Sequence, residues 1–254
     1  MKCILLLHGF LSDKHDFEPI IEDLNKQYDY VHRICFPGHG IAFGKEKFTE
    51  EATFALLDKT YQELAKKYQT IDVIGYSMGG ALGAYLASKY PIHRLVLLAP
   101  AYKYFNLEAP IVKAAIYWRI LKGLKKAKKE HETSKENKFA KKLSFVFEDD
   151  KKSLHFGARA FLVTALPKYF LAFRKIIKRV TSSIEPYNIP TLILWGELDQ
   201  LVPRGSVEEV YQFCLSPEKK KIIFDDITHL MLLSTNNQKL IDAIFDYLGE
   251  RDSL

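Results

Sequence analysis

The segment GYSMG at residues 75–79 constrains the fold more than any other feature of the chain, because it places a serine between two glycines. The run before it, IDVI, has the length of a buried strand, and the run after it, ALGAYLASKY, is typical of a helix. A strand that passes directly into a helix at a serine needs a sharp, strained turn, which only small neighbours such as Gly75 and Gly79 tolerate. The pattern predicts that Ser77 stands above a sheet at a helix N-terminus, where backbone amides favour negative charge.

Short apolar runs alternate with helical patterns on both sides of this segment. Leu240, Ile244, Phe245 and Leu248, for example, share one face of a helix. Alternating strands and helices favour right-handed crossovers and a layered α/β fold with a mostly parallel sheet. The predicted strands are Cys3–Leu7, Val31–Cys35, Ile71–Gly75, Leu95–Leu98, Thr191–Trp195 and Lys221–Phe224.

One segment carries the whole basic excess of the chain. The 37 Lys and Arg residues outnumber the 31 Asp and Glu residues, for a net charge of +6. Residues 101–186 contain 20 basic and 8 acidic residues, a net +12, and the remainder is therefore at −6. This shift in composition predicts a core formed by residues 1–100 and 187–254 and an inserted basic subdomain at 101–186. The insert is expected to be helical, with Ile116, Ile120, Leu121 and Leu124 on one stripe.

Composition and cysteine use exclude several classes of protein. With 254 residues, 48% apolar and 27% charged, the chain is expected to fold as one or two globular domains. No apolar run approaches the ~20 residues that span a bilayer, so a transmembrane segment is not expected. Cys3, Cys35 and Cys214 form no CxxC pattern, and their odd number favours a reducing cytoplasm over a disulfide framework.

Two further polar residues follow predicted strands, as a catalytic site in an open α/β sheet requires. Asp199 lies in WGELDQLVP, just after the strand TLIL, and is favoured over Glu197, although a turn aspartate ahead of Pro203 is the alternative. His229 lies in DITHL, after the strand KIIF. The order Ser77, Asp199, His229 matches the order Ser, Asp/Glu, His in which such a site is assembled. Their combination predicts a catalytic triad.

A triad also needs donors for a developing oxyanion. Gly9, after the first strand, lets the backbone turn so that the amide of Phe10 can face the serine. The second expected donor is the amide of Met78, the residue after the nucleophile. His8 is expected to shape this loop through hydrogen bonds and not to act as a base.

The motifs HGF, FPGHG, GYSMGG, GELDQLVP and THL occur in an order that resembles the α/β-hydrolase superfamily, over residues 2–100 and 187–250. Within it the chain is most similar to small Gram-positive carboxylesterases and monoacylglycerol-lipase-like serine hydrolases. The resemblance implies an α/β-hydrolase fold with a helical cap inserted after the strand LVLLA. Because the chain opens on the strand before HGF, six strands are expected. The resemblance also implies Ser77, His229 and Asp199 as the triad, with Phe10 and Met78 as oxyanion donors.

The expected function is hydrolysis of carboxylic esters with short to medium acyl chains, possible substrates including monoacylglycerol, through an acyl-enzyme. A thioesterase, a carbon–carbon bond hydrolase or an aminopeptidase could use the same residues, and a non-catalytic receptor could share the fold. Dehalogenases and epoxide hydrolases are disfavoured, since they use an aspartate where this chain has Ser77. Neither a metal nor an organic cofactor is expected.

The expected partner is a small ester substrate, and the sequence does not indicate an oligomeric state. The lysine-rich stretch that includes Lys122, Lys125 and Lys129 raises the alternative of a nucleic-acid or membrane-binding surface. A solvated helix is the favoured interpretation, because lysine-rich helices usually keep a surface hydrated. No nucleic acid is expected, while the lysines would permit weak association with acidic lipid surfaces.

Overall fold

Six parallel strands form the centre of the protein. The computed structural model describes residues 1–43, 45–102, 109–161 and 166–249. The strands are β1 Lys2–Leu7, β2 Tyr30–Arg33, β3 Thr70–Tyr76, β4 Arg94–Leu98, β5 Thr191–Gly196 and β6 Lys220–Phe224, in the order β2-β1-β3-β4-β5-β6. Every neighbouring pair is parallel, and Leu5 of β1, for example, pairs with His32 of β2 and Val73 of β3. The prediction of six strands is confirmed.

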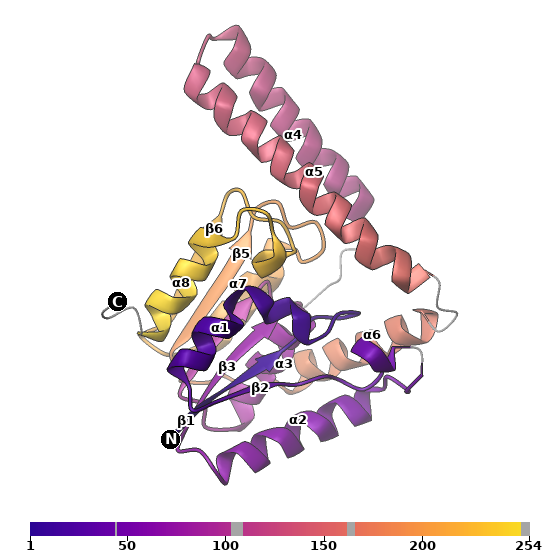
Figure 1. Ribbon diagram of the computed structural model, residues 1–254, viewed down its shortest axis with the longest axis vertical. Coiled ribbons are helices and arrows are strands. Elements are labelled where there is room, and N and C mark those ends of the chain that lie inside the picture. Colours follow the sequence, from indigo (N-terminus) through magenta and orange to yellow (C-terminus); the bar gives the residue numbers. More distant parts are fainter. Residues whose placement is uncertain (44, 103–108, 162–165, 250–254) are drawn as a thin grey trace.

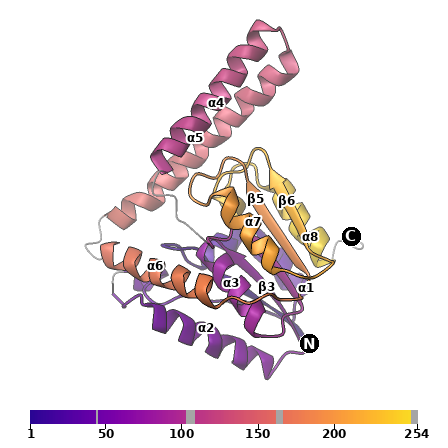
Figure 2. The same cartoon turned by 180° about the vertical axis from the view of Figure 1, so that it is seen from behind.

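Helices cover both faces of this sheet (Figures 1 and 2). Helices α1 and α8 lie on one face, and α2, α3, α6 and α7 lie on the other. Because both faces are covered, the central strands are continuous apolar runs, and the five residues Cys3–Leu7 of β1 are fully buried. The helices are α1 Glu18–Gln27, α2 Glu50–Ala65, α3 Met78–Lys89, α4 Ala109–Lys129, α5 Thr133–Phe161, α6 Leu166–Ser183, α7 Arg204–Phe213 and α8 Gln238–Leu248, with short 3₁₀ helices η1 Lys14–Phe17, η2 Gly40–Ala42 and η3 Met231–Leu233.

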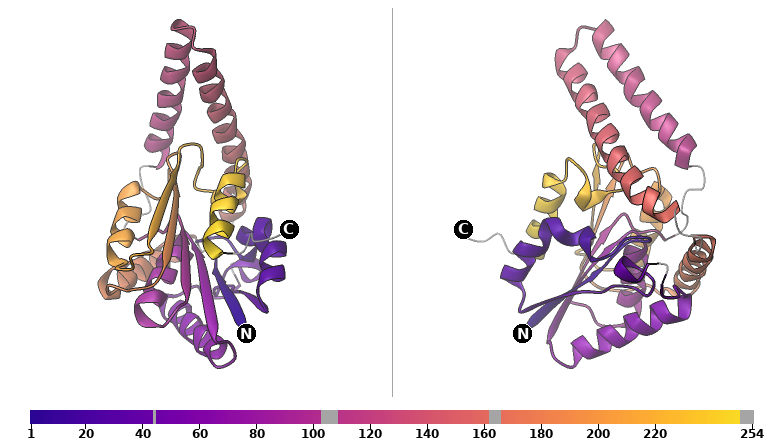
Figure 3. Two further views of the ribbon diagram at one scale, coloured as in Figure 1. Left: turned by 90° about the vertical axis from the view of Figure 1, so that its left-hand side faces the viewer. Right: turned by 45° about the vertical axis from the view of Figure 1, so that its right-hand side comes forward.

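The segment between β4 and β5 has two parts with different roles. Helices α4 and α5 form an antiparallel hairpin that projects beyond the sheet domain, as Figures 1 and 3 show. Helix α6 instead packs against α2 and α3 and returns the chain toward the start of β5. A parallel pair of strands needs such a crossover, so α6 completes the layer of helices on that face. In the described part of the chain no helix is long and apolar enough to span a membrane.

A small apolar cluster joins the hairpin to the sheet domain. Ile116 and Ile120 of α4 and Val146 of α5 are buried against Leu198, which lies just after β5. Of the predicted stripe on α4, these two isoleucines are buried and Leu121 is 49% exposed. The hairpin is only two helices thick, so it has no second layer to cover the outer part of the stripe. Several aromatic residues of the insert, among them Tyr104 and Phe156, lie outside the residues whose side chains are described.

Candidate active site

Ser77 occupies a sharp turn between β3 and α3. Its backbone has φ 52° and ψ −112°, a region that residues with a side chain rarely adopt. Close approach of the backbone explains both neighbouring glycines: a Cβ at position 75 would lie 2.3 Å from the Gly79 carbonyl oxygen, and one at position 79 would lie 1.9 Å from the Leu7 carbonyl oxygen. The turn therefore holds Ser77 at the carboxyl edge of the sheet, as the sequence pattern predicted.

His229 joins Ser77 to Asp199. The Nε2 atom of His229 lies 3.1 Å from Ser77 Oγ, and its Nδ1 atom lies 2.8 Å from Asp199 Oδ2. The carboxylate can only accept, so Nδ1 carries the proton and Nε2 is left to accept the serine proton. All three residues are buried, with exposures of 2% for Ser77, 5% for Asp199 and 8% for His229.

The Asp199 carboxylate is fixed by its own loop. Its Oδ1 atom accepts the backbone N–H groups of Leu201 and Val202 at 2.8 and 2.9 Å, which leaves Oδ2 facing the imidazole. Glu197, the alternative carboxylate in the same motif, is exposed. The geometry therefore separates the two candidates that sequence alone ranked only by position.

Gly196 brings the loops after β5 and β6 together. A Cβ at this position would lie 2.1 Å from the Ile227 carbonyl oxygen, two residues before His229. Only glycine allows this approach, and it places the loop of Asp199 beside the loop of His229. Gly196 directly follows a predicted strand, where close backbone approach is a usual reason for glycine, but no role was predicted for it from the sequence.

Gly9 is held through both of the peptide groups that flank it. The Gly9 N–H donates to Asp16 Oδ2 at 2.9 Å, and the Gly9 carbonyl lies 2.7 Å from His8 Nδ1. Because His8 Nε2 accepts the N–H of Phe36 at 3.0 Å, Nδ1 must be the donor to Gly9. In a trans peptide the carbonyl and the next N–H point in opposite directions, so this bond fixes the direction of the Phe10 N–H. Burial lowers the pKa of His8 to about 3, which keeps the ring neutral.

The second expected donor, the Met78 N–H, belongs to the first residue of α3. The first N–H groups of a helix have no acceptor within it, so this amide is suited to receive negative charge. Phe10 lies in the loop after β1 and Met78 at the start of α3, and the two segments are in close contact, since a Cβ at position 79 would meet the carbonyl oxygens of Leu7 and His8.

Two residues near the site were missed by sequence analysis. Asp16 is buried and accepts bonds from Gly9 and Ser12, and burial raises its pKa to about 6. Tyr76 donates its hydroxyl to the His229 carbonyl at 2.8 Å, across 153 positions of sequence. Neither residue has a local signal, because each contact depends on the assembled sheet.

The described residues contain no group of His, Cys, Asp and Glu side chains that could hold a metal ion. A serine hydroxyl beside an imidazole that a carboxylate orients supports nucleophilic attack and proton transfer without one. The chemistry open to this arrangement is acyl transfer.

Comparison with known proteins agrees with this chemistry. Residues 1–236 match the model of the family described as "Serine aminopeptidase, S33". A thermostable monoacylglycerol lipase from a Bacillus species is 24% identical over 252 residues, 97% of this chain and 90% of that protein. The carboxylesterase of Bacillus subtilis is 21% identical over 255 residues, 99% of this chain and 94% of that protein. The monoacylglycerol lipase of Paleococcus ferrophilus shares the fold, with a TM-score of 0.65 at 18% identity over 97% of this chain and 93% of that one.

Proposed function

The chain belongs to the serine aminopeptidase family that residues 1–236 match, and from this premise we propose that Ser77, His229 and Asp199 form a triad that cleaves carboxylic esters. The protein is an enzyme of the esterase and lipase type with the α/β-hydrolase fold. The observation that carries the proposed triad is the continuous set of hydrogen bonds from Ser77 through His229 to Asp199.

The proposed reaction begins when His229 Nε2 takes the proton of Ser77 Oγ as that oxygen attacks the ester carbonyl. Asp199 orients the ring and stabilises its cationic form. The N–H groups of Phe10 and Met78 receive the oxyanion, and His229 then gives its proton to the departing alcohol. Water, activated by the same ring, releases the acid from the acyl-enzyme.

An aromatic wall beside the oxyanion loop supports an apolar acyl group. The Phe10 ring stacks on Phe173 of α6 at 4.6 Å and meets Phe170 edge-on at 5.3 Å. Each methylene buried on such a surface contributes ~0.8 kcal/mol, so short to medium acyl chains should be preferred over acetate. Monoacylglycerols are candidate substrates, in line with the name of the Bacillus relative.

The proposal includes the division of the chain into a core, residues 1–100 and 187–254, and a basic helical cap, residues 101–186. The projecting α4–α5 hairpin and its apolar contact with Leu198 support the cap. Helix α6 attaches the cap to the core through α2 and α3. A cytoplasmic location is supported by the three free cysteines, one of which, Cys35, is exposed.

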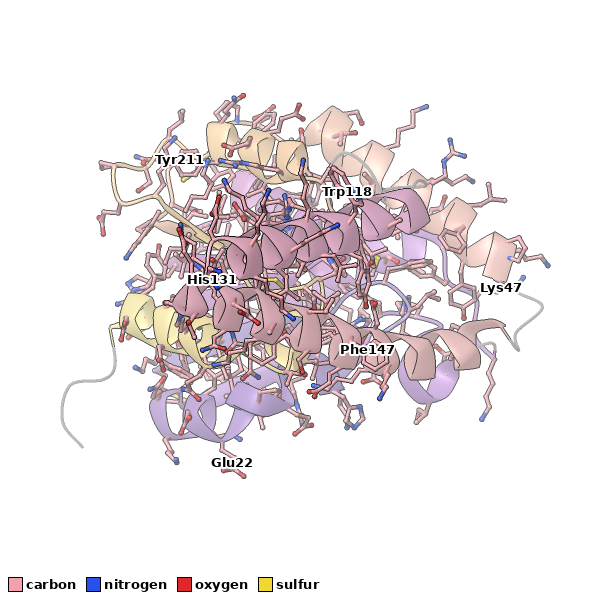
Figure 4. The ribbon with its side chains drawn as sticks, turned by 90° about the horizontal axis from the view of Figure 1, so that it is seen from above. Glu22, Lys47, Trp118, His131, Phe147 and Tyr211 are labelled. Carbon is pink, nitrogen blue, oxygen red and sulfur yellow. The ribbon has the colours of Figure 1, made fainter. Side chains whose placement is uncertain are left out.

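The basic face of α4 supports weak association with anionic lipid. Five exposed residues lie on one face of this helix, each three or four positions from another member of the set. They are Trp118, Leu121, Lys122, Lys125 and Lys129. Lys122 Nζ lies 4.9 Å from the Trp118 ring centre. Figure 4 shows Trp118 on this helix and Phe147 on its neighbour α5, and both residues are exposed. An aromatic group among lysines suits the interface of an anionic bilayer.

Vesicle sedimentation tests this association. The protein should bind vesicles of phosphatidylcholine and phosphatidylglycerol at low salt and release them as salt rises. Replacing Lys122 and Lys125 by Glu should abolish binding, while the same change at exposed Lys66 and Lys67, at the end of α2, should leave it unchanged. Equal losses in both pairs, or no binding at low salt, would remove lipid association from the proposal.

The proposed chemistry is tested by Ser77→Ala with Ser88→Ala as the matched control, since Ser88 lies on α3 away from the turn. Hydrolysis of p-nitrophenyl esters from acetate to palmitate should vanish in the first variant and persist in the second. A fluorophosphonate should label Ser77 in the wild type. Faster turnover of a thioester or an amino-acid p-nitroanilide than of any ester would transfer the assignment to a thioesterase or an aminopeptidase.

A further inference from the structure

A buried carboxylate of the hairpin is bonded to the loop that carries His229. Asp149 of α5 is 1% exposed. Its Oδ2 atom accepts the hydroxyls of Thr228 and Ser234, each at 2.6 Å, and its Oδ1 atom accepts both the N–H and the hydroxyl of Thr235 at 2.8 Å. Lys152 Nζ is 3.9 Å away. A carboxylate removed from water requires donors of this kind, so the contact between α5 and the loop is specific in position.

One of these bonds ends next to His229. Thr228 directly precedes the histidine, and on the other side the His229 carbonyl accepts the Tyr76 hydroxyl. Tyr76 precedes Ser77, so the backbone at His229 is held from the serine side by β3 and from the insert side by α5. The main chain that carries the imidazole is therefore held on two sides, in addition to the ring's own contacts with Ser77 and Asp199.

The next residue of α5 reaches the loop of the acid. Asp150 accepts Gln200 Nε2 at 3.4 Å and the Tyr117 hydroxyl at 2.7 Å. Leu198, on the same loop as Asp199, packs in the apolar cluster of the hairpin. The hairpin therefore contacts the loops of both the base and the acid, through consecutive side chains that diverge on the helix surface.

We propose that Asp149 is a positioning residue for His229, acting through the hydroxyl of Thr228. The inserted hairpin then has a role in catalysis: it sets the distance of the base from Ser77. This inference rests on the proposed function. A displacement of about 1 Å in such a site can cost ~10²-fold in rate, so the bond is expected to affect turnover more than substrate binding.

Thr228 and Ser234 provide a matched pair. Both hydroxyls donate to the same oxygen at the same distance, and both residues are buried. Thr228→Val should lower kcat for p-nitrophenyl butyrate by ~10- to 100-fold with KM within about two-fold. Ser234→Ala should lower the Tm by about as much as Thr228→Val does, but keep kcat within about two-fold of the wild type. Thr228→Ser, which keeps the hydroxyl that Thr228→Val removes, should keep most of the wild-type kcat.

Asp149→Asn completes the test. If Asp149 acts through Thr228, the double variant Asp149→Asn/Thr228→Val should turn over no more slowly than the slower single variant. Equal falls in kcat for Thr228→Val and Ser234→Ala, or a loss confined to KM, would overturn the inference even if Asp149→Asn fails to fold. Fluorophosphonate labelling of wild-type Ser77 is scored separately, so a failure of the proposed function cannot be mistaken for a failure of this inference.

Discussion

The backbone at Ser77 predicts an unusual order of stability among variants at that position. With φ 52° and ψ −112°, the residue lies where glycine is favoured, and a side chain there costs about 1 to 3 kcal/mol. Ser77→Ala retains Cβ and this cost. Ser77→Gly removes both, and each variant loses the hydroxyl that contacts His229.

Two other effects lower the stability of Ser77→Gly relative to Ser77→Ala, and a control variant must account for them. Glycine has greater freedom in the unfolded chain, worth about 0.5 to 1 kcal/mol, and loss of a buried carbon costs ~0.8 kcal/mol. Ser88 of α3 has no positive φ, so Ser88→Gly compared with Ser88→Ala carries the entropic effect and part of the burial effect without the strain. The preference for glycine over alanine should therefore be greater at position 77 than at position 88 by about 1 to 3 kcal/mol.

Urea unfolding at 25 °C, followed by circular dichroism, measures the four free energies of unfolding. A chain of this length shifts its Tm by about 2 to 4 °C per kcal/mol, so a thermal scan serves as a second measurement. If the difference between glycine and alanine is the same at both positions within about 0.5 kcal/mol, the turn stores no strain and the reasoning fails. Both Ser77 variants should be inactive, which makes the gain of Ser77→Gly a stabilisation at the expense of function.

Three further predictions concern the surroundings of Ser77. Asp199→Asn should lower kcat for p-nitrophenyl butyrate by orders of magnitude through the loss of imidazole orientation, whereas Glu197→Gln should change it by less than two-fold; the reverse result would assign the acid to Glu197. Gly196→Ala should lower kcat at saturating ester because its Cβ would meet the Ile227 carbonyl, and an unchanged kcat would contradict the close approach of the two loops. Burial raises the pKa of Asp16 to about 6; since the folded state holds this proton more tightly than the unfolded state, its ionisation should destabilise the fold by about 2 kcal/mol as pH rises from 4 to 6. Urea unfolding should show Asp16→Asn gaining on the wild type across that range, and parallel pH curves would refute the shift.

The six strands and the Ser77 turn could be predicted because their signals are local. A buried parallel strand is a continuous apolar run, and the turn needs glycines at fixed offsets, so both appear within a few residues of sequence. Asp199 and His229 were found by their position after strands and by their order along the chain. In a parallel sheet, the loops that follow neighbouring strands lie at the same edge, so position after a strand predicts which residues can come into contact.

The contacts that fix the site residues in space have no local signal in the sequence. Asp16 and Asp149 occur in ordinary charged stretches, and their partners become apparent only in the folded protein; Asp149 and Thr228 are 79 positions apart. The exposure of Leu121 could not be predicted for the same reason, because helical periodicity indicates a face but not how much of it a neighbouring element covers.

The place of the hairpin in the chain has a consequence for how such proteins can diversify. Strand β4 must pair with β5 across residues 99–190, and the entropy of closing a loop grows only with the logarithm of its length: doubling that segment would cost about 0.6 kcal/mol. The hairpin forms through contacts between neighbours in sequence, so it can be lengthened, shortened or exchanged with little effect on the assembly of the sheet. An exchanged hairpin must nevertheless bring its own acceptor to Thr228, so new substrate range and retained turnover would have to be acquired together.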